Sequence, residues 1–134
     1  MTRDINSSPA THMGRIEQVE VDPTSIGQMN FSDYLLETAG YRQATVSLIG
    51  TLASGEHGSC RVGVLMLPRE TTIIEAWKRD RFLGLVDEVS AGVGEGATYM
   101  QGQLDIDIKF PAYVLGFYNT CPVKVTLSLY SYLK

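Results

Sequence analysis

Alternating apolar and polar residues, the pattern of half-buried β-strands, dominate the last two thirds of the chain. On this basis residues 44–53, 60–67 and 123–130 are predicted strands, and the first two are expected to pair as a hairpin. In residues 104–110 the alternation predicts one core-facing row and one row facing solvent or a partner: Leu104, Ile106, Ile108 and Phe110 against Asp105, Asp107 and Lys109. Residues 113–118 are almost continuously apolar, as in a strand covered on both faces.

Short strands separated by turn signals predict an all-β fold, an antiparallel β-sandwich of jelly-roll-like form, over residues 30–134. One stretch of this domain, residues 70–84, fits two structures. We favour a strand over residues 71–78, because Thr71 to Ile74 are β-branched and follow Pro68. A helix remains the alternative, since the spacing of the apolar residues up to Trp77 also suits a helical face.

Residues 1–29 are predicted to form an extended N-terminal arm, because polar and turn-forming residues separate their apolar ones. Only residues 16–21 alternate like a strand. Ordering such a segment costs roughly 1–2 kcal/mol per residue, and its dispersed side chains cannot form a core of their own. We therefore expect the arm to cross a neighbouring subunit and to add a strand to an open sheet edge, with these contact residues: Ile5, Met13, Ile16, Val19, Val21 and Ile26.

One short N-terminal helix is predicted over residues 30–40. Asn30 or Ser32 can cap its start, Asp33 lies in the first turn, and Gly40 follows the last helical position. A helix of about two turns is too short to be stable alone, so we expect it to pack against the sandwich.

Composition excludes several classes of protein. The net charge is −4, and no extended basic cluster provides the electrostatic footprint of a nucleic-acid-binding protein. No apolar run approaches the ~18 residues that a membrane span needs, and the first 30 residues lack the apolar middle section of a signal peptide. We therefore expect neither nucleic acid nor a membrane among the partners.

The residues that carry chemistry do not form a recognisable catalytic or metal-binding set. The two histidines, His12 and His57, lie far apart in the sequence, and His57 falls in a Gly- and Ser-rich loop. Residues 92–97 match the G-x-G-x-x-A form of a dinucleotide fingerprint, but no helix pattern follows, so a turn is the better interpretation. Asp105 and Asp107 share one strand face, which favours a solvated surface. The sequence predicts no enzyme, no cofactor and no metal.

Cys60 and Cys121 are the only cysteines, and both lie at the edges of predicted strands. Without a secretory signal, the favoured interpretation is two reduced thiols that act as small apolar residues. A disulfide between them is the alternative, which would indicate an extracellular or oxidising setting.

Tyrosines gather near the C-terminus, where Tyr130 and Tyr132 fall on one strand face. A C-terminal strand that is apolar on both faces suggests that one face meets another subunit. We therefore add Tyr130 and Tyr132 to the predicted partner contacts and expect a homo-oligomer, a dimer or a trimer.

Three sequence motifs occur in order along residues 62–100: a strand ending in Leu67-Pro68, the segment Thr71–Trp77, and the Gly-x-Gly turn within Val89–Met100. In this the chain resembles small virion proteins of tailed phages, which are β-sandwich structural parts of the particle such as head-decoration, cement or fibre components. The resemblance implies a location in the virion after assembly in the host cytoplasm, the major capsid protein or another virion protein as partner, and no catalytic residues.

Two functions follow from these observations. The first is a non-enzymatic capsid decoration or cement protein that binds and stabilises a preformed lattice as a homo-oligomer. The alternative is a carbohydrate-binding β-sandwich that uses Trp77 and tyrosines as stacking platforms.

Overall fold

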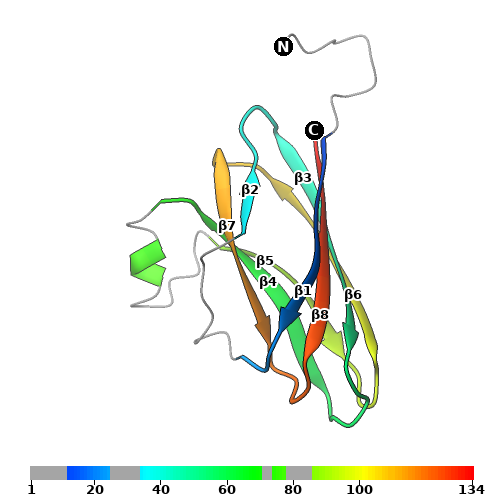
Figure 1. Cartoon of the computed structure of the whole chain (residues 1–134). Helices are drawn as coiled ribbons and strands as arrows, with labels where there is room; N and C mark the ends of the chain where they lie inside the picture. The colour runs from blue at the N-terminus through cyan, green and yellow to red at the C-terminus, as the bar shows by residue number, and fades with distance from the viewer. Residues whose placement is uncertain (1–11, 25–33, 71–73, 78–85) are drawn as a thin grey trace.

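The computed structural model describes residues 12–24, 34–70, 74–77 and 86–134, and its regular structure there is almost entirely β (Figure 1). The described residues form eight strands: β1 His12–Val21, β2 Leu35–Glu37, β3 Gln43–Leu52, β4 Cys60–Pro68, β5 Asp87–Val93, β6 Tyr99–Asp107, β7 Ala112–Asn119 and β8 Val125–Leu133. They make two four-stranded sheets with the orders β1-β8-β3-β6 and β2-β7-β4-β5, and every pairing is antiparallel. The all-β, sandwich-like prediction is confirmed at this level.

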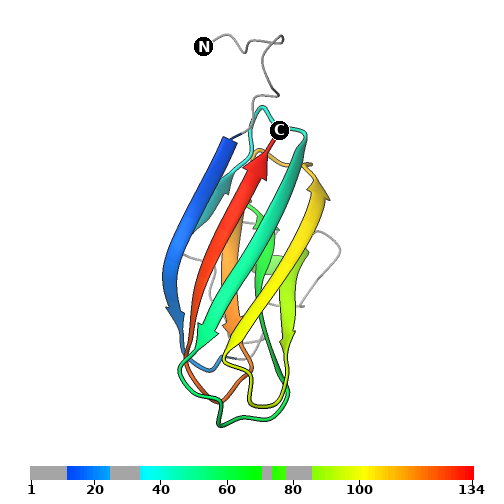
Figure 2. The same ribbon diagram turned by 90° about the vertical axis from the view of Figure 1, so that its right-hand side faces the viewer.

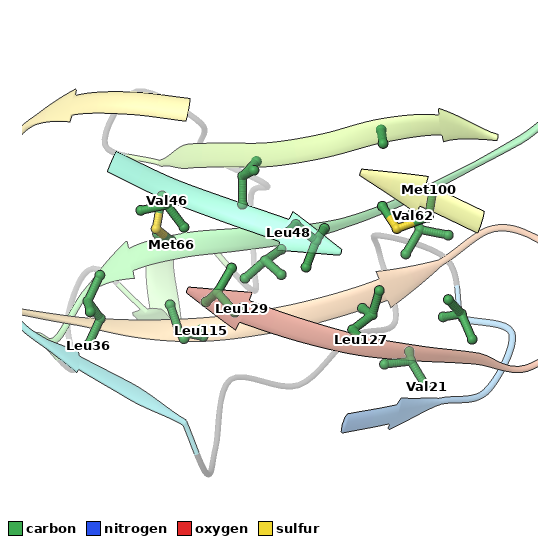
Figure 3. Packing of buried hydrophobic residues seen from close by; sticks show 14 of the residues in the cluster. Val21, Leu36, Val46, Leu48, Val62, Met66, Met100, Leu115, Leu127 and Leu129 are labelled. Atoms are coloured by element: carbon green, nitrogen blue, oxygen red, sulfur yellow. The ribbon is translucent and has the colours of Figure 1, made fainter. Parts of the chain in front are cut away.

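The two sheets pack face to face on an apolar core to which both contribute (Figure 3). Side chains from β3, β6 and β8 meet side chains from β4 and β7, as the alternation requires. Val46, Leu48, Val62, Met66 and Leu127 are fully buried there. In residues 104–110 the predicted register is confirmed, because Ile106 is buried, Leu104, Ile108 and Phe110 pack against the core, and the intervening acidic residues are exposed.

The predicted hairpin of residues 44–53 and 60–67 is wrong. β3 pairs with β6 and β8, whereas β4 pairs with β5 and β7 in the other sheet. The connecting loop therefore crosses from one sheet to the other, and the apolar faces of the two strands meet across the core. Alternation establishes which residues face inward, but it does not say which strand lies alongside.

Residues 74–77 are helical, so the strand favoured over residues 71–78 is wrong where the structure describes it. The Ile74 amide donates to the carbonyl oxygen of Glu70 at 3.0 Å, the i→i−4 bond of a helix. The turn places Trp77, 1% exposed, over the outer side of β4 and β7 in a second cluster with Leu65 and Leu67. β7 is consequently covered on both faces, as its sequence predicts.

The helix predicted over residues 30–40 is also wrong in its described part, since residues 35–37 form β2 and pair with β7. The Thr38 amide donates to Pro111 O at 2.9 Å and its hydroxyl to Phe110 O, and Gly40 turns the chain with φ +88°. Tertiary pairing of a buried Leu36 therefore overrides the local helix signal. Asn30, Ser32 and Asp33 lie outside the described residues.

Part of the predicted arm belongs to the two-sheet body. Residues 12–21 are β1, which pairs with β8 of the same chain and is interrupted by a register shift at Gln18, where φ is +58°. The strand expected over residues 16–21 is thus present, but longer and paired within its own chain. Residues 1–11 and 25–29 of the predicted arm lie outside the described part.

Candidate interaction surface

The outer side of the sheet β1-β8-β3-β6, seen in Figure 2, is a surface that we call the tyrosine face. Its members alternate along each strand with residues that point into the core. The two central strands contribute Thr126, Ser128, Tyr130 and Tyr132 from β8, and Thr45, Ser47, Ile49 and Thr51 from β3. The edge strands contribute Arg15, Glu17 and Glu20 from β1, and Tyr99, Gln101, Gln103, Asp105 and Asp107 from β6.

The strand register arranges these side chains in rows across the sheet. One row runs from Arg15 through Tyr130 and Ser47 to Gln103. The next row contains Tyr132, Thr45 and Asp105, and the Thr45 hydroxyl donates to the Asp105 carboxylate at 2.7 Å. Tyr130 and Tyr132 therefore lie on one face of a central strand, as their sequence spacing predicts.

Charge is distributed unevenly over the tyrosine face. Within the central strands β8 and β3 no outward side chain is charged. The charges of the face lie on the edge strands β1 and β6 and on Lys124 and Lys134, which flank the two ends of β8. Large side chains remain exposed here: Tyr99 at 52%, Tyr132 at 47% and Ile49 at 37% of their surfaces. An uncharged centre with exposed tyrosines and a charged border is the distribution found in protein–protein interfaces.

The edge strand β1 has ion pairs along its length. Arg15 Nε lies 3.1 Å from a Glu17 carboxylate oxygen, and Lys124 Nζ lies 3.7 Å from Glu20 and 3.9 Å from Asp22. These pairs are exposed, and such pairs are worth only about 0–1 kcal/mol. They are therefore able to exchange partners when another charged surface approaches.

The opposite sheet has a polar cluster that sequence analysis missed. The Tyr118 hydroxyl donates to Glu88, Arg61 Nη2 donates to Ser90 Oγ at 2.7 Å, and Arg61 Nε lies 3.9 Å from Glu88. Burial, followed by the hydrogen bond to Glu88, raises the pKa of Tyr118 to about 12. The phenol is thus protonated at neutral pH and serves as a donor. Because three strands contribute to the cluster, no local motif could have revealed it.

Gly63 makes room for this cluster. A Cβ at this position would lie 2.7 Å from the Tyr118 hydroxyl oxygen and 2.8 Å from Ser90 Cβ. Only a residue without a side chain fits there without displacing its neighbours.

The His57 side chain links two loops. Its Nδ1 lies 2.7 Å from Gly58 O and its Nε2 lies 2.6 Å from Ala97 O. These two carbonyl acceptors raise its pKa, and Glu95 adds to the effect, while burial opposes it. Both ring nitrogens are therefore engaged in holding the loop at residues 53–59 to the turn before β6, which is a structural role.

Cys60 and Cys121 form a disulfide, so the favoured prediction of two free thiols is wrong. Val62 pairs with Asn119 in the β4–β7 ladder, and the two cysteines lie two residues beyond that pair, one on each strand's continuation. Strand pairing brings them together, with Cα atoms 5.0 Å apart, within the range for disulfides. The bond closes a loop of sequence separation 61 and ties β4 to the β7–β8 connection.

The remaining motifs have structural explanations. Residues 94–98 connect β5 and β6 through a turn in which Gly96 has φ +75°, as the sequence pattern favours over a dinucleotide site. Asp105 and Asp107 are exposed on the tyrosine face. Among the described residues, no group of three or more His, Cys, Asp or Glu side chains is placed to hold a metal ion.

The predicted arm contacts fall into three groups. Val21 is buried in the core of its own chain, and Ile16 and Val19 pack against that core, so we do not carry these three forward as partner contacts. Their alternation in β1, together with its pairing to β8, explains why they point inward. The backbone of Met13 pairs with Tyr132, and Ile5 and Ile26 lie outside the described residues.

No protein-family model matches the sequence, and no significant match is found among curated proteins. Within the described part of the chain, no helix is long and apolar enough to span a membrane.

Proposed function

We propose that this chain is a non-enzymatic structural protein of a virus particle, a capsid decoration or cement protein that binds and stabilises a preformed lattice as a homo-oligomer. In this proposal it is assembled in the host cytoplasm and acts in the virion, beside the major capsid protein or another virion protein. The same proposal includes a relationship to the small virion proteins of tailed phages that the sequence resembles.

The observation that carries the proposal is the strand order. Antiparallel sheets with the orders β1-β8-β3-β6 and β2-β7-β4-β5 fit a jelly roll, in which the chain passes between sheets after β1, β2, β3, β5, β6 and β7 and only β4–β5 are joined as neighbours. Viral capsid proteins, lectins and cupins use this architecture. We therefore take the finer fold to be a jelly roll.

The core favours a function on the outside of the molecule. A site for a small ligand requires a cavity with a few converging polar groups. In the described part, apolar side chains from both sheets fill the centre of the space between them, with Val46, Leu48 and Met66 fully buried. A hollow of about 280 Å³ lies at the edge of the sandwich, between β2 and the strands β1 and β8, away from this centre. Among the classes that use a jelly roll, those that bind through an outer surface, capsid proteins and lectins, fit best.

The disulfide is compatible with this location. Disulfides persist on virion surfaces and in other oxidising settings. The Cys60–Cys121 bond would be retained after a particle leaves the cell, where it keeps β4 attached to the β7–β8 connection.

Particle binding tests the proposal. Purified full-length protein is mixed with capsids that lack it, and the capsids are collected by centrifugation. The expected result is saturable binding at a fixed number of copies per capsid and a higher temperature of capsid disruption. Binding that never saturates, or saturation without stabilisation, would contradict a cement function.

A carbohydrate-binding function is the second candidate, supported by exposed tyrosines beside hydroxyl and amide side chains on the tyrosine face. Trp77 is buried under its own helical turn and is withdrawn as a stacking platform. A glycan array distinguishes the candidates, because lectin activity predicts binding that is lost in both Tyr132→Ala and Tyr99→Ala. The capsid proposal predicts no glycan signal above background.

A further inference from the structure

We propose that two copies of the chain associate through their tyrosine faces, about a two-fold axis that runs parallel to the strands between β8 and β3. The inference rests on the proposed function, because it names the surface that joins the subunits of the homo-oligomer. Three features of the face support it: the position of its charges, its size, and the pairing of charges that the axis produces.

The first feature is the uncharged centre. An outer sheet face that remains in water usually includes charged residues on its central strands, because they keep the surface soluble. Here the outward residues within β8 and β3 are Gln, Thr, Ser, Ile and Tyr, and the charges lie on β1, on β6 and at the two ends of β8. Interfaces have this anatomy, with aromatic residues enriched and charged residues depleted at the centre.

The second feature is size. Neighbouring strands are about 4.8 Å apart and rise about 3.4 Å per residue, so a face of four strands is roughly 19 Å wide and roughly 30 Å long. Two such faces in contact would bury on the order of 1,100 Å² in flat projection, close to the lower end of stable interfaces. Because side chains make both faces uneven, the buried surface area would exceed this flat projection.

The third feature is charge pairing. A two-fold axis parallel to the strands places β1 of one copy over β6 of the other at the same level along the sheet. Arg15 shares a row with Gln103, and Asp105 lies in the adjacent row, two residues along β6. Arg15 of each copy therefore approaches the Asp105 carboxylate of the other, and symmetry produces this pair twice. An axis perpendicular to the strands would instead place β6 over β6 and β1 over β1 in opposite directions, so that Arg15 would have no acidic residue of β6 opposite it.

Two matched substitutions test the inference. Ile49, 37% exposed, lies at the centre of the tyrosine face, whereas Leu35, 36% exposed, lies on β2 of the other sheet. Sedimentation velocity of the full chain should show wild type passing from 14.7 kDa to twice that mass as concentration rises. Ile49→Lys should weaken this association more than about tenfold, while Leu35→Lys should leave it unchanged. Tyr132→Lys repeats the test at a second position on the face, should Ile49→Lys fold poorly.

A charge exchange tests the axis itself. Arg15→Asp and Asp105→Arg should each weaken the dimer, and the double variant should restore it, because the pair is re-formed with opposite polarity. A wild-type chain that stays monomeric at all concentrations, or equal weakening by Ile49→Lys and Leu35→Lys, would overturn the inference. Failure of the double variant to restore association would overturn the axis.

The dimer and the proposed function fail in distinguishable ways. Capsid binding by a protein that is monomeric in solution would reject the dimer and retain the decoration function. If the protein forms the dimer but does not bind capsids, the decoration function is rejected and the interface is retained.

Discussion

The outer faces of the two sheets differ in how they are covered. On the sheet β2-β7-β4-β5, Trp77 lies over Leu65 and Leu67, and Tyr118 is buried beside Glu88. On the sheet β1-β8-β3-β6, tyrosines and Ile49 remain exposed around an uncharged centre. The chain itself therefore covers the outer face of the sheet β2-β7-β4-β5. The outer face of the sheet β1-β8-β3-β6 stays exposed and is available to a second molecule.

The largest expected effect concerns the covered face. Trp77→Ala removes a buried indole and should lower the free energy of unfolding by ~3–5 kcal/mol. Tyr132→Ala, on the exposed face, should change it by less than about 0.5 kcal/mol. Urea denaturation of dilute protein measures both. Similar losses in the two variants would mean that the faces do not differ as described.

The disulfide should have the next largest effect. Replacing both Cys60 and Cys121 with serine should cost ~2–4 kcal/mol, because the closed loop no longer restricts the unfolded chain. Thermal denaturation with and without reductant provides the measurement. Reductant should destabilise the wild type and leave the double variant unaffected.

Two glycines of the covered sheet provide a smaller, matched contrast. Gly63→Ala inserts a Cβ against Tyr118 and Ser90 and should cost ~1–3 kcal/mol through overpacking. At Gly92 an added Cβ meets nothing within 4 Å, so Gly92→Ala should be nearly neutral. A neutral Gly63→Ala would contradict the close packing of the polar cluster.

The smallest effect is on pH dependence. Because the folded-state pKa of His57 is raised above 6.5, its contribution to stability is fully present below that value and is lost as the pH rises through the folded pKa. The melting temperature of wild type should therefore decline over that range more than that of His57→Gln. Parallel pH profiles would show that the two carbonyl contacts do not favour the charged ring.

In residues 104–118 the sequence pattern predicts which residues face inward, but it does not predict which strands pair, and it assigns the buried Val21 and Trp77 to outer contacts. The alternation in residues 104–110 and the doubly covered strand at residues 113–118 depend on local patterns, and both are confirmed. β2 and the helical turn at residues 74–77 depend on contacts with distant segments, such as Thr38 with Phe110 and Trp77 with Leu65, which override local propensity. The disulfide likewise follows from the β4–β7 register, which no local pattern encodes.

The same limit applies to the tyrosine face. The spacing of Tyr130 and Tyr132 placed both on one strand face, but the neighbours of that strand were unknown. The uncharged centre arises because β3 lies beside β8, a pairing that no local pattern encodes.

Tyrosine footprinting tests the central claim, that one face is left for a second molecule, most directly. Hydroxyl-radical labelling of the full chain is compared at concentrations below and above self-association, and the modified tyrosines are quantified by mass spectrometry. The account predicts that Tyr132, 47% exposed when the chain is alone, becomes protected on association, while half-buried Tyr41 outside the face is unchanged and buried Tyr118 stays unreactive. Labelling of Tyr132 that is equal at all concentrations, in a protein that does associate, would contradict it.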